Sequence, residues 1–510
     1  MEKIFKKLQM LFEKEIISLV HNSDNERLLI VAGGITPLCQ SYSVLRKVFF
    51  ERFKIFLNTA QLQTLIEFLE IHPLTDDTVY ESACRIYNGK DCLAYELNKD
   101  TEECIVITPE EINISNVPNV YFKHAADFEN QVEPSWDVEP KDIFSYIHHH
   151  FNLKNEKQEK LLVLYLVTAF FGLQISHSLL ILTGEKGSSK STTMRKLEKL
   201  IDPKRSDLCG IPKGTDGLEL RLANTYFVCL DNLSSINRNI SDTIARAVTG
   251  GSVTKRALYH NTKEVVLNIK AMIAINGVSV VARESDLLDR SLILELNRIS
   301  AKKIKSEQEL WEEFEQDRPK ILGCIFLILS EALYDDKPIT VKEKIRLADF
   351  HIACIKVGRV LGMTDEEVSE LLWENQRKIN RHSIDEDMVA CCVIELMKNK
   401  KSYINSMTGL LGDLNEIATQ NSIIGSVLPK TPNHLSNRLS KIRSNLQAEY
   451  SITYNIANVG SFKQITIKNC GKVVFLLIMV NFYWRRVQMK KTPSQINFYP
   501  VPDFQLSTFF

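Results

Sequence analysis

The chain has 510 residues, enough for about three domains, because a single hydrophobic core rarely grows beyond about 250 residues. Hydrophobic residues make up 44% and charged residues 25%, which is ordinary for a soluble globular protein. Lys and Arg number 63, as do Asp and Glu, and this balance excludes a nucleic-acid-binding surface spread over the whole molecule.

The cysteines and the apolar stretches indicate in which cellular compartment the protein is expected. The 11 cysteines are scattered without a C-x-x-C pair, which is typical of free thiols in a reducing cytosol. The most apolar stretches, residues 161–173 and 473–480, are shorter than the roughly 18 to 20 residues of a membrane-spanning helix. Residues 1–20 predict an amphipathic helix rather than a signal peptide. We therefore expect a cytoplasmic protein without a membrane partner.

Residues 1–140 predict a mixed α+β region whose role the sequence does not indicate. Apolar spacing favours helices over residues 1–75, and short apolar runs between turn residues favour a small β subdomain over residues 80–122. Three consecutive histidines, 148–150, invite a metal-binding interpretation. Neighbouring residues on a helix point in different directions, however, so we expect structural roles for them.

The most informative stretch is residues 179–192. An apolar run of strand length breaks at a glycine, passes through small residues to Lys-Ser, and leads into a segment with helical periodicity. This is the order of a phosphate-binding loop, in which the lysine reaches the outer phosphates and the next hydroxyl holds Mg²⁺. Serine replaces the usual glycine at position 189, and its small size still allows phosphate to approach. ATP and Mg²⁺ are therefore the expected ligands, bound by Gly184, Glu185, Lys186, Gly187, Ser188, Ser189, Lys190, Ser191 and Thr192.

Two later apolar strands end in polar residues. The strand over residues 225–232 ends at Asp231, the Walker B position, which would hold Mg²⁺ through water. Many P-loop ATPases follow this aspartate with a glutamate, but here the residue is Asn232, which orients water without accepting its proton. The general base is therefore open. The strand over residues 270–277 places Asn276 where it can hydrogen-bond the attacking water or the γ-phosphate.

Residues 249–260, between these two strands, predict a hairpin that projects from the core. Two glycines favour a turn, and basic and aromatic residues follow it. Lys255, Arg256 and His260 would meet DNA phosphates there, as a loop lining a pore does. A solvated basic turn is the alternative.

Arg290 lies at the start of a further predicted strand. It either forms a surface ion pair with Asp289 or reaches the ATP of a neighbouring subunit to stabilise transition-state charge. The order of the motifs favours the second interpretation.

In this order, the motifs resemble the core of a superfamily 3 helicase, of the phage and poxvirus primase-helicase branch of AAA+ ATPases carried by mobile elements. The resemblance covers residues 141–335. It implies an α/β P-loop AAA+ fold and a ring of identical subunits, as a hexamer, with ATP at the interfaces and single-stranded DNA in the channel. By this likeness the site residues are Lys190 and Ser191 as Walker A, Asp231 as Walker B, Asn276 as sensor 1 and Arg290 as the finger in trans. No primase signature is present in residues 1–140.

Residues 336–470 predict helices followed by a winged-helix-like DNA-binding domain, and residues 471–510 a basic and apolar tail. One helix carries a buried stripe of Leu435, Leu439, Ile442 and Leu446, with Asn437, Arg438 and Lys441 on its other faces. A strand, a turn and a second strand follow, so this helix would enter the major groove of duplex DNA. From residue 425 onward, 11 basic and 2 acidic residues give a net charge of +9. A basic helical cap with a hairpin is the alternative.

The sequence thus predicts an ATP-dependent DNA helicase that serves replication of a phage or mobile element. The alternative is a DNA-binding AAA+ switch, such as an origin-binding or loading protein, with little unwinding. Asn232 favours the switch and the basic hairpin favours the motor. A small-molecule kinase is a third, weaker interpretation.

Overall fold

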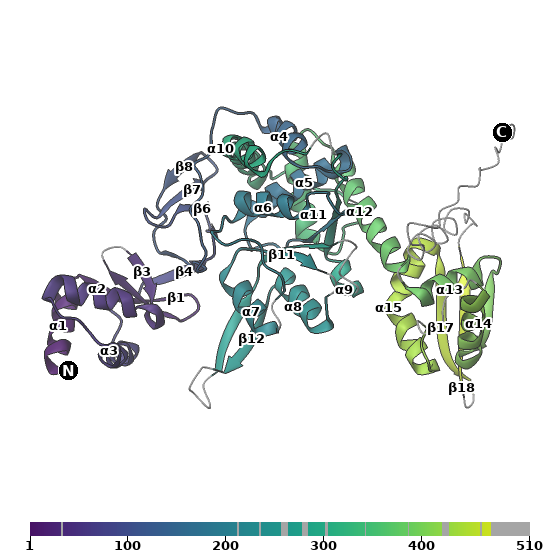
Figure 1. Ribbon diagram of the computed structural model, residues 1–510, viewed down its shortest axis with the longest axis horizontal. Coiled ribbons are helices and arrows are strands. Elements are labelled where there is room, and N and C mark those ends of the chain that lie inside the picture. The colour runs from purple at the N-terminus through teal and green to yellow at the C-terminus, as the bar shows by residue number, and fades with distance from the viewer. Residues whose placement is uncertain are drawn as a thin grey trace. The chain divides into compact units, whose positions relative to one another are not determined.

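The computed structural model shows a mixed α/β chain in two units, residues 1–380 and 381–510 (Figure 1). The division lies within helix α12 (Asp365–Asp385), whereas the sequence placed a domain boundary after residue 335.

Among the described residues no helix is long and apolar enough to cross a membrane. The predicted tail, residues 471–510, lies outside the described part of the chain. The structure describes residues 1–31, 34–211, 214–233, 236–256, 264–277, 284–300, 304–341, 343–385, 387–420, 428–459 and 462–470.

The sequence predicted helices throughout the first 75 residues, but the structure also contains strands there. Three strands lie between helices α1 (Glu2–Glu13) and α2 (Tyr42–Phe53), and α3 (Thr59–Ile71) follows. Strands of four to six residues are too short for periodicity to distinguish them from helical turns. They belong to a five-stranded sheet of order β3-β2-β1-β4-β9, with bounds β1 Ile17–Asn22, β2 Arg27–Val31, β3 Gly34–Pro37, β4 Val79–Ala83 and β9 Val120–Phe122.

The predicted small β subdomain is present as an antiparallel sheet of order β5-β6-β7-β8. One face packs into the main core through Leu93, Tyr95, Ile105 and Ile107, and the other buries Ala94, Cys104 and Val106 in a smaller cluster. The bounds are β5 Ile86–Asn88, β6 Leu93–Asn98, β7 Glu103–Ile107 and β8 Ile112–Ser115.

The centre of the first unit is a parallel sheet of order β11-β14-β10-β15. Its strands are continuous apolar runs because helices cover both faces of a parallel sheet. The bounds are β10 Leu179–Thr183, β11 Phe227–Leu233, β14 Met272–Gly277 and β15 Ser291–Glu295. The helices are α4 Ile143–His150, α5 Glu156–Thr168, α6 Lys190–Ile201, α7 Thr215–Asn224, α8 Arg238–Thr249 and the short α9 Ser285–Leu288.

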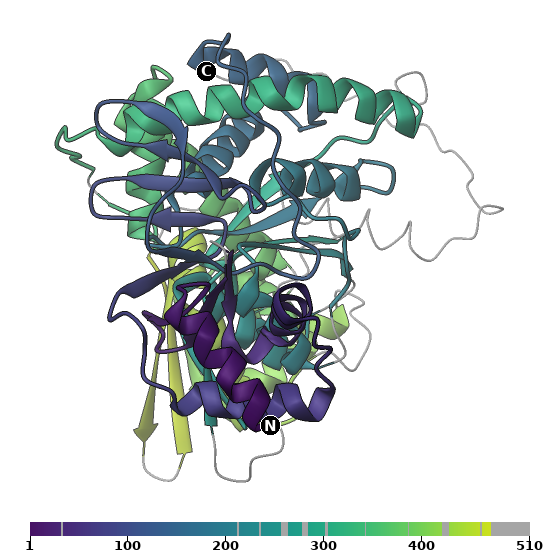
Figure 2. The same ribbon diagram turned by 90° about the vertical axis from the view of Figure 1, so that its left-hand side faces the viewer.

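Two longer helices complete the first unit. Helix α10 (Glu307–Leu333) packs against α4, α5 and α11 (Figure 2). It begins with a capping box, in which Ser306 and Glu309 each accept a backbone N–H of the other residue. Helix α11 (Ala348–Val360) buries Phe350 and Cys354 in the same core, although the sequence had assigned it to the C-terminal domain.

The second unit contains α13 (Met388–Met397), α14 (Met407–Gln420) and α15 (Pro432–Tyr450) with an antiparallel sheet of order β16-β18-β17. The stripe on α15 is buried as predicted. Strands β17 (Ile452–Val459) and β18 (Phe462–Asn469) confirm the two predicted strands, but β16 (Ser402–Ser406) had been read as helix. Only Tyr403 of β16 is buried, so its apolar signal is weak, and its partner strand lies far away in sequence.

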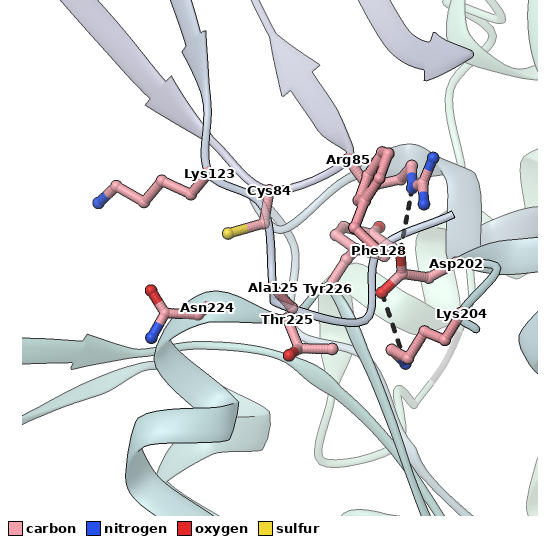
Figure 3. A pocket seen from close by; sticks show the side chains of 10 residues that line it. All are labelled: Cys84, Arg85, Lys123, Ala125, Phe128, Asp202, Lys204, Asn224, Thr225 and Tyr226. Carbon is pink, nitrogen blue, oxygen red and sulfur yellow. Dashed lines mark hydrogen bonds and ion pairs between the residues drawn. The ribbon is translucent and has the colours of Figure 1, made fainter. Parts of the chain in front are cut away.

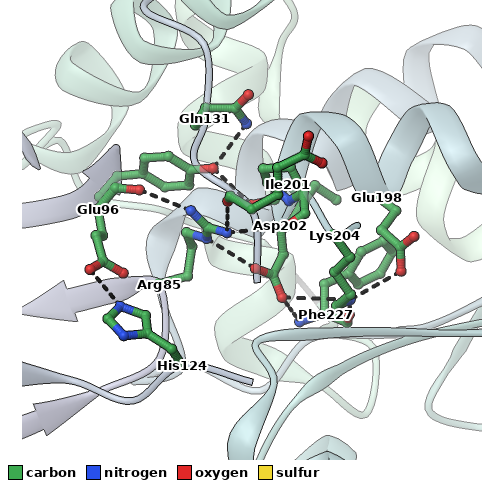
Figure 4. Close-up of polar contacts among 12 residues, drawn as sticks. Arg85, Glu96, His124, Gln131, Glu198, Ile201, Asp202, Lys204 and Phe227 are labelled. Atoms are coloured by element: carbon green, nitrogen blue, oxygen red, sulfur yellow. Dashed lines mark hydrogen bonds and ion pairs between the residues drawn. The ribbon is translucent and has the colours of Figure 1, made fainter. Parts of the chain in front are cut away.

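A buried ion cluster joins the β subdomain to the parallel sheet (Figure 4). The Arg85 guanidinium donates to Asp202 Oδ1 at 3.0 Å, and Lys204 Nζ lies 3.0 Å from Glu198 Oε1 and 3.7 Å from Asp202 Oδ2. Asp202 Oδ2 also accepts from the backbone N–H of Phe227 at 3.1 Å. Asp202 directly follows α6 and Phe227 begins β11. The cluster therefore fixes these two elements against each other.

A small pocket opens beside this cluster, lined by Lys123, Phe128 and Thr225 among others (Figure 3). The Phe128 ring centroid lies 3.7 Å from Arg85 Cζ, a cation–π contact. Burial alone would raise the pKa of Asp202, but Lys204 and Arg85 outweigh burial and lower it. The carboxylate is thus held ionised by its two cations.

Replacing Arg85 by Ala should lower the free energy of unfolding of the first unit by about 3 to 5 kcal/mol, because one partner of a buried ion pair is lost. Urea unfolding followed by tryptophan fluorescence measures the change. The matched control is Lys123→Ala, which removes the half-exposed Lys123–Asp24 pair and should cost less than about 1 kcal/mol. Equal losses for the two variants would contradict a special role for the cluster.

Candidate nucleotide site

The loop after β10 is tightly packed at Gly184 and left-handed at Ser189. Gly184 packs so closely that a Cβ there would lie 2.6 Å from Ser188 Oγ and 2.8 Å from the Leu296 carbonyl oxygen. Ser189 adopts the left-handed conformation, with φ +61°, directly before α6 begins at Lys190. Glycine adopts this conformation without strain, which explains why the usual pattern has glycine at this position.

The Lys190 ammonium lies inside the loop. Its Nζ donates to the carbonyl oxygens of Gly184 at 2.7 Å and Glu185 at 3.0 Å. Burial lowers the pKa of Lys190, and the negative charge of Asp231 opposes this effect. The predicted loop residues Glu185, Lys186 and Gly187 are exposed, whereas Ser188 is buried and Ser189, Ser191 and Thr192 are partly buried.

Four predicted residues from three elements meet at the carboxyl edge of the sheet. One oxygen of Asp231, Oδ1, accepts from Ser191 Oγ at 2.8 Å and from Asn276 Nδ2 at 2.5 Å. Asn276 is only 1% exposed, and its Oδ1 accepts the backbone N–H of Asn232 at 2.6 Å. Asn232 is left-handed, with φ +55°. The Asn276 amide therefore fixes both the Asp231 carboxylate and the backbone that follows it.

This donor set fits Mg²⁺. A hydroxyl and a carboxylate are hard oxygen ligands, and Mg²⁺ in proteins is held by one or two such groups while waters and phosphates complete its octahedron. In the described part of the chain, no group of three His, Cys, Asp or Glu side chains could hold a metal by itself. The oxygens of Ser191 and Asp231 thus suit an ion that arrives with a phosphate ligand.

Arg290 stands apart from this cluster. Its guanidinium pairs with Asp286, four residues earlier, and not with Asp289 as the ion-pair alternative had it. Asp289 instead lies 3.3 Å from Arg346 Nη1, and Arg346 Nη2 lies 2.6 Å from Asp286 Oδ1. The Arg290 side chain is 16% exposed. Within one subunit it does not approach the site.

The predicted hairpin is present, since β12 (Gly251–Arg256) pairs antiparallel with β13 (Glu264–Ile269) and extends away from the sheet (Figure 1). Lys255, however, already has ion-pair partners within the chain. Its Nζ lies 3.0 Å from Glu219 Oε2 and 3.3 Å from Asp216 Oδ1, both on α7. Burial alone lowers the pKa of Lys255, but these carboxylates outweigh it and raise the pKa. The side chain of Arg256 and the whole of His260 lie outside the described residues.

In the second unit, Asn437, Arg438 and Lys441 are all exposed on α15. Arg438 has a structural partner, because its Nε lies 2.5 Å from Asp387 Oδ2. The other Asp387 oxygen, Oδ1, caps α13 by accepting the N–H of Ala390 at 3.0 Å. Asn437 and Lys441 lie on the exposed surface of the same helix.

The three consecutive histidines contact three different carboxylates. The distances are 2.9 Å from His148 to Glu159, 3.3 Å from His149 to Glu313 and 3.1 Å from His150 to Asp317. Burial lowers the pKa of His150 to about 4. The prediction that these side chains diverge is confirmed.

The segment that follows β15 contacts the loop, which the sequence pattern did not predict. The backbone N–H of Leu296 donates to the Thr183 carbonyl at 2.9 Å, and that of Ile299 donates to the Gly187 carbonyl at 3.1 Å. These bonds support the loop from one side. The sequence pattern would indicate this contact only if β15 were known to be the parallel neighbour of β10. That pairing brings the carboxyl end of β15 beside the loop.

The chain was compared with solved structures and with curated proteins. Among solved structures, one titled "SCCmec type IV Cch - active helicase" is 11% identical, with a TM-score of 0.47, over 89% of this chain and 93% of that chain. The apo NrS-1 C-terminal region is 13% identical, with a TM-score of 0.39, over 90% and 98% of the two chains. No curated protein matches the chain.

Two protein-family models match successive parts of the chain. The model of the replication protein of actinomycete integrative conjugative elements, RepA, matches residues 146–368, and the model of the RepA C-terminal domain matches residues 389–472. The first match contains the parallel sheet and the second lies within the second unit. Over these two stretches the chain is therefore similar to a RepA-type replication protein of a mobile genetic element.

Proposed function

We propose that the chain is an ATP-dependent DNA helicase that replicates a mobile genetic element, with a superfamily 3-like AAA+ core. The observation that carries this proposal is the meeting of Ser191, Asp231 and Asn276 beside Lys190 at the carboxyl edge of a parallel sheet. Ligands of open α/β sheets bind at this edge. The similarity to the RepA family supports the replication of a mobile element.

At this site the chain would bind and orient a nucleoside triphosphate. The N–H groups of residues 184–191 would face the phosphates, and Lys190 would exchange the carbonyls of Gly184 and Glu185 for phosphate oxygens. Ser191 and Asp231 would hold Mg²⁺, which supplies charge neutralisation to the phosphates when bound. Asn276 would keep the Asp231 carboxylate aimed at the metal.

Water activation is the weak part of this site. Asn276 donates one N–H to Asp231 and accepts from the backbone of Asn232, so its second N–H and the Asn232 side chain are the amide groups that could orient the water. An amide does not accept a proton, and we therefore expect slow hydrolysis. This favours, as a second candidate, an ATP-controlled DNA-binding switch with little unwinding. The ion pairs of Lys255 with α7 also favour the switch.

In the proposed ring of subunits, Arg290 would act as an arginine finger towards the ATP of a neighbouring subunit. To reach a neighbouring subunit's ATP, Arg290 must leave Asp286, and Arg346 already contacts the same carboxylate at 2.6 Å. Asp286 would thus keep a cationic partner after the exchange, which lowers the cost of releasing Arg290.

ATP hydrolysis with and without single-stranded DNA, together with strand displacement from a forked duplex, tests this proposal. We expect DNA-stimulated hydrolysis with displacement, and a loss of at least about 100-fold for Lys190→Ala because its charge stabilises the transition state. Lys90→Ala, an exposed lysine of the β subdomain, is the charge-matched control and should behave as wild type. Stimulated hydrolysis without displacement would favour the switch, and a chain that binds no ATP would refute both candidates.

The second unit is proposed to bind duplex DNA as a winged helix, with α15 in the major groove and β17 and β18 as the wing. Its helix, strand, turn and strand order and the exposure of Asn437 and Lys441 support this assignment.

The double variant Asn437→Ala/Lys441→Ala should bind duplex DNA about tenfold more weakly in fluorescence anisotropy. The slope of log affinity against log salt concentration should fall in magnitude by about one, because one phosphate contact is lost. Lys398→Ala, which removes a lysine of the same unit 3.4 Å from Glu395, should leave the affinity unchanged. Unchanged binding by the double variant would exclude α15 as the contact helix.

A further inference from the structure

Two large aromatic side chains lie at the surface of the N-terminal region. Phe50 on α2 is 52% exposed, and Phe56 in the loop that follows is 70% exposed. The opposite face of α2 buries Leu45, Val48 and Phe49, so the helix has already placed its apolar face in the core. The exposed rings are therefore additional to what the fold of this region requires.

Each exposed ring has its own cation. Lys54 Nζ lies 5.7 Å from the Phe50 ring centroid, and Arg46 Cζ lies 5.3 Å from that of Phe56. Arg46 is held in place because its Nε donates to the Leu57 carbonyl at 3.1 Å. We name these four residues, Arg46, Phe50, Lys54 and Phe56, the cation–aromatic row.

The row lies in a locally basic segment of a neutral chain. Residues 42–58 contain four cations, Arg46, Lys47, Arg52 and Lys54, against one acid, Glu51. Within the described part of the chain, no carboxylate lies at ion-pair distance from any of these four cations. Their charge is available to an anionic partner.

We propose that the cation–aromatic row binds single-stranded DNA, with bases stacked on Phe50 and Phe56 and phosphates beside Arg46 and Lys54. Such surfaces combine aromatic rings, on which bases stack, with cations that contact the phosphates. Duplex DNA does not fit, because its bases are already stacked and offer no free face. The choice of DNA as the nucleic acid rests on the proposed function.

Two other kinds of partner fit the row less well. An interface with a protein has an apolar core depleted of charge, whereas each ring here lies against a cation. A helix that lies on a membrane needs a continuous apolar face towards the lipid, but the apolar face of α2 is buried in the protein. Single-stranded DNA is therefore the occupant to which this surface is complementary, and it gives the N-terminal region a function.

The test uses the full chain without nucleotide and a single strand that contains 5-iododeoxyuridine, which crosslinks to a stacked aromatic ring under near-ultraviolet light. Peptide mapping should place crosslinks at Phe50 and Phe56. The variant Phe50→Leu/Phe56→Leu keeps apolar surface but removes both π-faces, and it should lower single-strand affinity about tenfold or more. Ile71→Ala, at an apolar residue that is 80% exposed on α3, is the control and should change nothing.

The outcomes separate this proposal from the proposed function. Affinity unchanged in the double leucine variant, with no crosslink at the row, would overturn the proposal even if DNA still stimulates ATP hydrolysis. Binding of wild type to phosphatidylserine vesicles without crosslinking to DNA would also overturn it. Crosslinks at the row in a chain that hydrolyses no ATP would support DNA binding by the cation–aromatic row and refute the proposed ATP-dependent helicase.

Discussion

The Asp231 carboxylate is the constraint on which the nucleotide site depends. One of its oxygens accepts from a hydroxyl at the start of α6 and from an amide at the end of β14, so it ties together elements that are distant in sequence. At the other end of α6, Asp202 accepts the first N–H of β11. The helix and the strand are thus held to each other at both ends, once by a buried ion cluster and once by the site itself.

Three cations that the sequence assigned to phosphates already have oxygen partners within the chain. Lys190 contacts loop carbonyls, Lys255 contacts two carboxylates of α7, and Arg290 contacts Asp286. Under the proposed function, each must exchange an internal partner for a phosphate of ATP or DNA. Binding of either ligand would then release contacts inside the subunit, which is a physical route by which ATP and DNA could influence each other.

The sequence predicted well those features that depend on local pattern. The strands that end at Thr183, near Asp231 and near Asn276 are unbroken apolar runs, and the stripe on α15 has a clear helical period. Their polar ends could be placed together because parallel strands end at one edge. The left-handed backbone at Ser189 and Asn232 was not predictable, because neither residue type requires it.

Features that depend on distant partners were missed. Strand β16 is a strand only because β18 pairs with it, and β1 to β3 are too short to show their period. The ion-pair alternative for Arg290 named its immediate neighbour, Asp289, whereas a short helix brings Asp286 to it. The sequence pattern likewise did not predict that Leu296 and Ile299 support the loop, nor the cation–aromatic row. Both features depend on contacts that the fold brings about.

The central claim is that Ser191 and Asp231 form a site for Mg²⁺ with a nucleoside triphosphate. Isothermal titration of the full chain with a non-hydrolysable ATP analogue, with Mg²⁺ and with EDTA, tests this claim most directly when repeated on Asp231→Asn. The account predicts that wild type loses affinity about tenfold or more without Mg²⁺, because the metal joins the carboxylate to the phosphates, and that Asp231→Asn is insensitive to Mg²⁺. Equal affinity of wild type with and without the metal, or an unchanged response in Asp231→Asn, would contradict it.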